Sequence, residues 1–276
     1  MSDFTRIKFQ GVSAQSLQKS SDKNLASATR FRWPRIGGVL AISFSTLAAF
    51  VWAVPSAGAA TTNVNLGTAS TFAVLAGSAI TNTGSSVITG DIGLSPGTAI
   101  TGFPPGIQSS GVTHTTDASA LSAQRDLTAA YIDAASRTPF TTVSGDLGGS
   151  TLVAGVYAST SSLSLTGTLT LNGAGNADSI FIFQAGSSLL GATSSRVLLE
   201  NGAQACHVFW QVGSSATLGT TSSFQGSIMA LTSVTLNTGA QVNGQVLARN
   251  GAVTLDSNVV TVPTCAAAIV STTTST

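Results

Sequence analysis

Residues 226–256 read GSIMALTSVTLNTGAQVNGQVLARNGAVTLD, and two short motifs occur twice within this stretch. Gly226 to Ala230 recurs as Gly244 to Ala248, and Val234 to Asn237 recurs as Val253 to Asp256. The two motifs return after nearly equal lengths of chain, and such self-similarity is typical of a coil of stacked structural repeats. The period suits three sides of about six residues each.

A third repeat has a longer period. Phe183 to Ser188 recurs as Trp210 to Ser215. The interval between these two copies is about one and a half times that of the first two repeats, which indicates insertions in some turns of the coil. From residue 62 onward, short segments of alternating apolar and polar residues are separated by Gly, Asn and Ser, a pattern typical of strands with one buried face. The sequence therefore predicts a mainly β solenoid, with a β-sandwich as the alternative.

One segment has helical rather than strand periodicity. From residue 117 to residue 135, apolar residues and alanines recur at helical spacing, with Asp117 as the expected N-cap and Pro139 beyond the end. We expect a helix at 117–135 that packs its alanine-rich side against the coil.

The N-terminal segment up to Ala60 differs from the rest of the chain. Seven basic residues precede an apolar run at 36–54, and an Ala-x-Ala site at Ala57 and Ala59 follows it. This order predicts a secretory signal over residues 1–59, cleaved near Ala59, and hence a secreted protein. An uncleaved membrane anchor through 36–54 is the alternative. The solenoid domain then spans 60–265, and 266–276 is expected to be a short disordered tail.

Charge is scarce throughout the chain, at 8% of residues. Beyond Ala60, four arginines against eight acidic residues leave a net charge of −4, so no basic stripe for nucleic acid is expected. Cys206 and Cys265, the two cysteines of the chain, both lie in the exported part, where a disulfide is favoured over two buried free thiols. Their spacing does not indicate zinc, and no metal or other cofactor is predicted.

Four segments share the order apolar residue, Thr, Leu, then Asn, Gly or Asp: Leu169–Asn172, Ala216–Gly219, Val234–Asn237 and Val253–Asp256. If Leu points inward, Thr points outward. Stacked on successive turns, the threonines would form a ladder with a spacing of about 4.8 Å. The candidate ladder is Thr170, Thr217, Thr235 and Thr254. The full candidate set of contact residues is Thr168, Thr170, Asn172, Thr217, Ser233, Thr235, Asn237 and Thr254.

Threonine is also common on the exposed face of strands that bind no partner, because it favours β structure. These rows, however, carry no Lys or Glu, although an exposed sheet usually bears charges that discourage association. A flat array of methyl and hydroxyl groups can order water in a lattice, and ice is the partner that such an array could match. Asp256 would then mark the edge of the face.

An enzymatic function is not expected, because the acids are scattered and no nucleophile elbow is present. Asp91, Asp146 and Asp178 are interpreted as turn residues. His207 is interpreted as a structural histidine, and His114 as a solvated one in a Thr-rich loop. No catalytic residue and no small-molecule substrate are therefore predicted.

The chain resembles the microbial ice-binding (antifreeze) protein family with the discontinuous β-solenoid fold. The resemblance rests on these segments: Leu66–Gly77, Gly90–Gly97, Leu152–Tyr157, Ala177–Gln184, Asn201–Gln204, Val208–Gly213 and Asn243–Arg249. It implies a right-handed, three-sided solenoid with a long helix along one side, and ice bound by one flat face. A Thr-Ala/Gly-x-Thr/Asn pattern often marks that face; Thr68–Thr71 fits it, whereas Thr166–Leu169 lacks the last residue.

The sequence thus predicts a secreted, monomeric protein whose partner is the surface of an ice crystal. A cell-surface adhesion or structural solenoid without ice activity is the alternative function.

Overall fold

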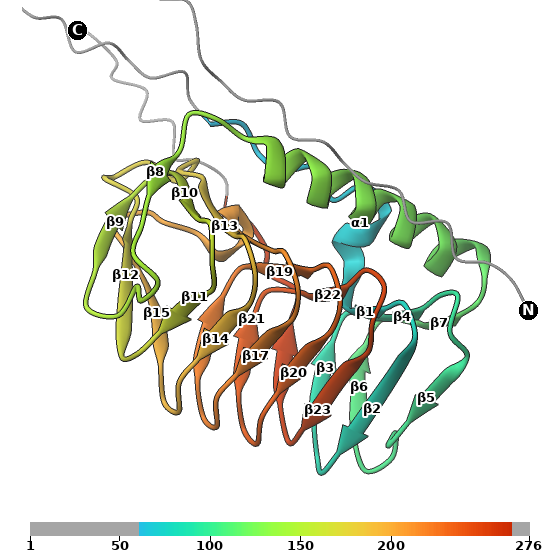
Figure 1. Cartoon of the computed structure of the whole chain (residues 1–276). Coiled ribbons are helices and arrows are strands. Elements are labelled where there is room, and N and C mark those ends of the chain that lie inside the picture. Colours follow the sequence, from blue (N-terminus) through green and yellow to red (C-terminus); the bar gives the residue numbers. More distant parts are fainter. Residues whose placement is uncertain (1–60, 267–276) are drawn as a thin grey trace, which may run out of the picture. The chain divides into compact units, whose positions relative to one another are not determined.

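In the computed structural model, residues 61–266 are described; the predicted signal (1–59), the possible anchor (36–54) and the tail beyond Ala266 lie outside this range. Within it, no helix has both the length and the apolar character that crossing a membrane requires. The described residues form three sheets wound into a coil, with one α-helix alongside (Figure 1). All strand pairs are parallel, which confirms the solenoid and excludes the sandwich.

The three sides of the coil are called sheets A, B and C. Sheet A runs in the order β7 (Thr113–Thr115), β4 (Asp91–Leu94), β1 (Phe72–Ala76), β22 (Val246–Ala248), β19 (Ser227–Ala230), β16 (Val208–Val212), β13 (Phe181–Ala185), β10 (Gly155–Ser159) and β8 (Thr141–Thr142). Sheet B runs β11 (Leu163–Leu165), β14 (Leu189–Gly191), β17 (Ala216–Leu218), β20 (Val234–Leu236), β23 (Val253–Asp256), β2 (Ala79–Thr83) and β5 (Ala99–Thr101). Sheet C runs β6 (Ile107–Ser110), β3 (Val87–Thr89), β24 (Val259–Thr261), β21 (Gln241–Asn243), β18 (Ser223–Gln225), β15 (Arg196–Glu200), β12 (Thr168–Asn172) and β9 (Thr151–Val153).

The coil is discontinuous. The N-terminal strands β1 to β7 build one end of it, and the strands from β8 onward start at the other end and wind back (Figure 1). The two blocks meet in every sheet, because β22 pairs with β1, β23 with β2 and β24 with β3. Neighbouring strands at this joint therefore come from opposite ends of the domain sequence, and Thr254 of β23 pairs with Thr81 of β2.

The helix α1 (Ala118–Ser136) connects the two blocks and lies along sheet A (Figure 1). Its Asp117 N-cap is confirmed, since the carboxylate accepts a hydrogen bond from the Ala120 N–H at 2.8 Å. The predicted helical stripe is confirmed as the buried side: Ala120, Ala123, Leu127, Ala130, Tyr131 and Ala134. Sheet A is consequently buried on both faces, which explains strands such as β13 and β16 in which all five residues are buried.

Two glutamines, Gln184 in β13 and Gln245 just before β22, bind the C-terminal ends of helical segments that lie against sheet A. The Gln184 amide donates to the Ala134 carbonyl at 2.8 Å and to the Arg137 carbonyl at 3.1 Å. Both carbonyls lie at the C-terminal end of α1, where no helix N–H group is available to donate to them. The Gln245 amide donates to the carbonyls of Ala69 (2.7 Å) and Phe72 (2.8 Å), at the end of the 3₁₀ helix η1 (Gly67–Thr71). Both glutamines are buried, so each bond avoids an unpaired polar group.

The interior of the coil is filled by stacked side chains from successive turns. Tyr157, Phe183 and Trp210 stack in adjacent strands, with ring centroids 5.5 Å and 4.1 Å apart, and Phe224 packs against Trp210 at 5.5 Å. The Trp210 ring N–H donates to the Gln225 carbonyl at 2.9 Å, so the buried indole leaves no donor unpaired.

Close stacking also explains the repeated glycines. A Cβ at Gly244 would lie 1.9 Å from the Gly226 carbonyl oxygen of the neighbouring turn, so no side chain fits there. The predicted insertions lie at the corner between sheets C and A. Residues 173–180 and 201–207 lengthen two turns there, whereas only Gly226 separates β18 from β19.

Candidate functional site

The outer face of sheet B carries a row of threonines on adjacent strands. The strand register aligns one outward residue per strand, here called the central row: Ser164, Leu190, Thr217, Thr235, Thr254, Thr81 and Thr101. Five successive strands, from β17 to β5, thus each contribute a threonine (Figure 1 shows their order along the coil). Their inward neighbours, such as Val234 and Leu236, are buried in the coil, so packing in the core fixes the outward direction of the row.

A second row runs beside the central row. Two residues before each member of the central row, at the start of the strand or just ahead of it, the chain has a small residue. These form the flanking row: Ser162, Ser188, Ser215, Ser233, Ala252, Ala79 and Ala99. Neither row contains an ionisable side chain. Asp256 lies beyond them at the margin, paired with Thr83 of the next strand, where it accepts a hydrogen bond from the Thr238 hydroxyl. Its predicted position at the edge of the threonine face is confirmed.

The structure separates the predicted contact residues into two groups. Thr217, Thr235 and Thr254 lie in the central row, Ser233 lies in the flanking row, and Asn237 is exposed just after β20. Thr168, Thr170 and Asn172 lie instead on β12 of sheet C, where Thr170 pairs with Leu198. The prediction that Thr170 continues the ladder of Thr217 is therefore wrong, because the shared local pattern does not determine which side of the coil a strand belongs to.

Two threonines of the central row were missed. Thr81 follows Ile80 and precedes Asn82, and Thr101 follows Ile100 and precedes Gly102, so both have the apolar-Thr-Asn/Gly order without the intervening Leu. A search for that looser pattern would have found them.

The outer face of sheet C differs in character from that of sheet B. Around Thr168, Thr170 and Asn172 it bears Arg196 and Glu200 on the adjacent strand β15. It also exposes large apolar residues, among them Ile107, Val153 and Val259, at 55%, 56% and 41%. Sheet C is thus a mixed surface, whereas the outer side of sheet A is covered by the helix.

Two carboxylates outside sheet B, Asp126 on α1 and Asp146 before β9, hold neighbouring segments of chain in place. The pKa of Asp126 is lowered because the Thr68 hydroxyl and N–H both donate to it at 2.7 Å, which fixes η1 to the helix. The pKa of Asp146 is lowered because the Thr166 hydroxyl donates to it, and its Oδ1 accepts from the Gly148 N–H at 3.0 Å. The interpretation of Asp146 as a turn residue is confirmed.

His114 is not solvated as expected. Its Nδ1 lies 2.7 Å from the Asp117 carboxylate and its ring centroid 5.5 Å from that of Phe72, which leaves the side chain 19% exposed. The Ala120 N–H and then His114 lower the pKa of Asp117, so this pair stabilises the start of the helix.

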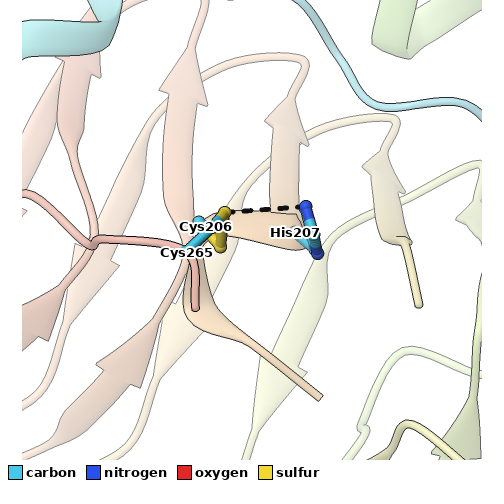
Figure 2. A group of neighbouring side chains, drawn as sticks. All are labelled: Cys206, His207 and Cys265. Carbon is cyan, nitrogen blue, oxygen red and sulfur yellow. Dashed lines mark hydrogen bonds between the residues drawn. A yellow bond between two sulfur atoms is a disulfide. The ribbon is translucent and has the colours of Figure 1, made fainter. Parts of the chain in front are cut away.

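Cys206, His207 and Cys265 lie together at the corner between sheets C and A (Figure 2). The two sulfur atoms are bonded to each other, which confirms the disulfide. The His207 Nε2 lies 3.6 Å from the Cys265 sulfur, and its Nδ1 lies 2.9 Å from the Ala177 carbonyl oxygen, which confirms a structural histidine. Disulfide sulfurs are not the thiolates that bind metal, so this cluster serves as a covalent clamp.

The fold and the site define a class of protein: a discontinuous parallel β-solenoid with an uncharged threonine face. Comparison with known proteins identifies the family, because the chain belongs to the Ice-binding-like family, whose model matches residues 74–261. An ice-binding protein of Nostoc sp. is 52% identical over 195 residues, covering 70% of this chain and 72% of the relative. An ice-binding protein of Flavobacterium frigoris is 38% identical over 214 residues, covering 72% of this chain and 76% of the relative.

Solved structures agree. An ice-binding protein from an Antarctic biological consortium superimposes with a TM-score of 0.74 at 48% identity, covering 76% of this chain and 96% of that one. An ice-binding protein from Antarctomyces psychrotrophicus gives a TM-score of 0.71 at 44% identity, covering 74% of this chain and 100% of that one. The relatives are ice-binding proteins rather than enzymes.

Proposed function

We propose that this protein adsorbs to ice crystals through the outer face of sheet B, and thereby inhibits ice growth and recrystallisation. The observation that carries this proposal is the run of five threonines on adjacent strands: Thr217, Thr235, Thr254, Thr81 and Thr101. The names of the relatives, all ice-binding proteins, support the same function.

The chemistry of the face explains why ice would be the partner. Parallel strands space the threonines by about 4.8 Å along the coil, and each presents one methyl and one hydroxyl group. Hydroxyl groups can join a water lattice as donors and acceptors, while methyl groups leave the water between them free to bond with other water. A charged side chain would orient its own hydration shell instead, and the two rows carry none.

The other two sides of the coil are less suitable for a flat solid. Sheet A is covered by the helix α1. Sheet C carries Arg196 and Glu200, together with exposed apolar side chains of unequal size. We therefore assign ice contact to sheet B alone, and interpret Thr168, Thr170 and Asn172 as ordinary surface residues.

Thermal hysteresis and ice-recrystallisation inhibition of the purified protein test this function. We expect both activities in the wild type. Replacing Thr235 and Thr254 by Tyr places two bulky rings on the face and should reduce thermal hysteresis by about tenfold or more, as loss of central contacts does in other interfaces. Thr170→Tyr on sheet C is the matched control and should leave it unchanged. An inactive wild type would favour the adhesion or structural alternative, and full activity of the Tyr variants would show that the face is wrong.

We also infer that the protein is exported, processed near Ala59, active as a monomer and without catalytic activity. The order of basic, apolar and small residues before Ala60 supports export. N-terminal sequencing of the protein recovered from the medium should give a start near Ala60. Recovery of the intact chain from the membrane fraction would support the anchor at 36–54 instead, and gel filtration should give the mass of one chain.

A further inference from the structure

The face on sheet B consists of two chemically different halves. On β23, β2 and β5, which lie on either side of the joint, the flanking residue is alanine; these strands are called the joint half. On β11, β14, β17 and β20 the flanking residue is serine, and these strands are called the serine half. The change occurs between Ser233 and Ala252, on neighbouring strands (Figure 1 labels β20 and β23 side by side).

Three of the four serine hydroxyls accept a hydrogen bond from a backbone N–H of the next turn. Ser215 Oγ accepts a hydrogen bond from the Ser233 N–H at 3.3 Å, and Ser233 Oγ accepts one from the Ala252 N–H at 3.1 Å. Ser162 Oγ likewise accepts from the Ser188 N–H at 3.4 Å. Each bond occupies one acceptor site of the hydroxyl and orients its oxygen toward the backbone of the next turn, so the serine half offers fewer free acceptor sites to a water lattice than its composition suggests.

The threonines of the two halves also differ in exposure. Thr254, Thr81 and Thr101 of the joint half are exposed, whereas Thr217 and Thr235 of the serine half are only half-exposed. The central row of the serine half then stops being threonine at Leu190, a large apolar side chain that is 47% exposed. Leu190 rises from the face where the flat row would otherwise continue.

We infer that ice is held mainly by the joint half, through Thr254, Thr81 and Thr101 with the methyl groups of Ala252, Ala79 and Ala99 beside them. This inference rests on the proposed function and makes it more specific. The contact is then assembled from both blocks of the coil, with Thr254 from the C-terminal block and Thr81 and Thr101 from the N-terminal one. The centre of the contact lies toward the β5 end of the sheet rather than at its middle strand, β20.

The same substitution in each half provides the test. Thr81→Tyr should reduce thermal hysteresis by about tenfold or more, and Thr217→Tyr by only about two- to threefold, because contact energy is concentrated in few residues. Both positions belong to the central row, and Thr81 lies nearer an end of sheet B than Thr217 does, so a role for central position alone would give the opposite order. Unchanged circular dichroism and melting temperature establish that each variant is folded.

The outcomes separate the inference from the proposed function. Equal losses in the two variants would overturn the division into halves while supporting sheet B as the ice face. Full activity of both variants, with an active wild type, would overturn sheet B as the face, and an inactive wild type would overturn the function itself.

A second pair of variants tests the flanking row without adding bulk. Ala79→Ser combined with Ala99→Ser removes methyl surface from the joint half and should lower thermal hysteresis several-fold. Ser215→Ala combined with Ser233→Ala makes the serine half resemble the joint half, although it removes the acceptors of the Ser233 and Ala252 N–H groups. Compared at a temperature where both variants are fully folded, it should lower thermal hysteresis by less than the first pair does. A loss only in the second pair would overturn the inference.

Discussion

Removing the disulfide should destabilise the protein strongly while leaving its ice activity intact. The perturbation is the double variant Cys206→Ser with Cys265→Ser, which avoids leaving one free thiol. The two cysteines are 59 residues apart in sequence. In the chain-entropy view, closing a loop of that length restricts the unfolded chain enough to contribute about 4 kcal/mol of stability.

That free energy converts into a measurable change in melting temperature. A domain of about 200 residues has an unfolding entropy of about 0.4 kcal/mol/K, so about 4 kcal/mol corresponds to a drop of about 10 °C. Part of the C-terminal docking persists without the disulfide, because the Gln204 side chain accepts from the Ala266 N–H at 2.6 Å and donates to the Ala266 carbonyl at 3.1 Å. These bonds belong to the folded state, whereas the entropic term acts on the unfolded chain, so the expected loss remains about 4 kcal/mol.

The disulfide and the proposed ice face lie on different parts of the coil. Cys206 belongs to the 3₁₀ helix η2 (Ala205–His207), between β15 of sheet C and β16 of sheet A, whereas the threonine rows lie on sheet B. Calorimetry or circular dichroism should thus show the lower melting temperature, and thermal hysteresis, measured just below the melting point of ice, should be unchanged. A drop of less than about 2 °C would refute the entropic argument, and a parallel loss of ice activity would refute the independence of the two regions.

Three further changes test the packing. Gln184→Leu leaves buried helix carbonyls unpaired and should cost about 1–3 kcal/mol in urea unfolding, whereas Gln241→Leu, at an exposed position of β21, should cost little. Phe183→Ala removes the middle ring of the aromatic stack and should cost about 3–5 kcal/mol; Phe140→Ala, at 52% exposed, is the control, and equal losses would contradict the buried stack. The pKa of Asp126 is lowered by folding, so its contribution is complete above about pH 4 and disappears as the pH falls through the folded-state pKa. Asp126→Asn should melt below the wild type at neutral pH with a gap that narrows in acid, and a constant gap would contradict this assignment.

The helix and the disulfide could be predicted from the sequence because both depend on local or compositional information. The periodicity of Ala120, Ala123, Leu127 and Ala134 identifies the buried side of α1 without knowledge of what it packs against. A chain with two cysteines has one intramolecular pairing available. The threonine pattern was also informative, since Thr217, Thr235 and Thr254 follow one another at regular intervals on successive turns.

The sequence by itself determined that outward threonines exist on a repeating coil, because the alternation of inward and outward residues is fixed by each strand. Only the tertiary structure decided which of them lie together. Thr170 has the same local order as Thr217 but belongs to sheet C, because insertions and corners of unequal length change which side a segment occupies. Thr254 and Thr81 meet because the coil is discontinuous, and their register is set by hydrogen bonds between strands from opposite ends of the domain. No local pattern encodes such a pairing, so the complete row of threonines is a property of the fold.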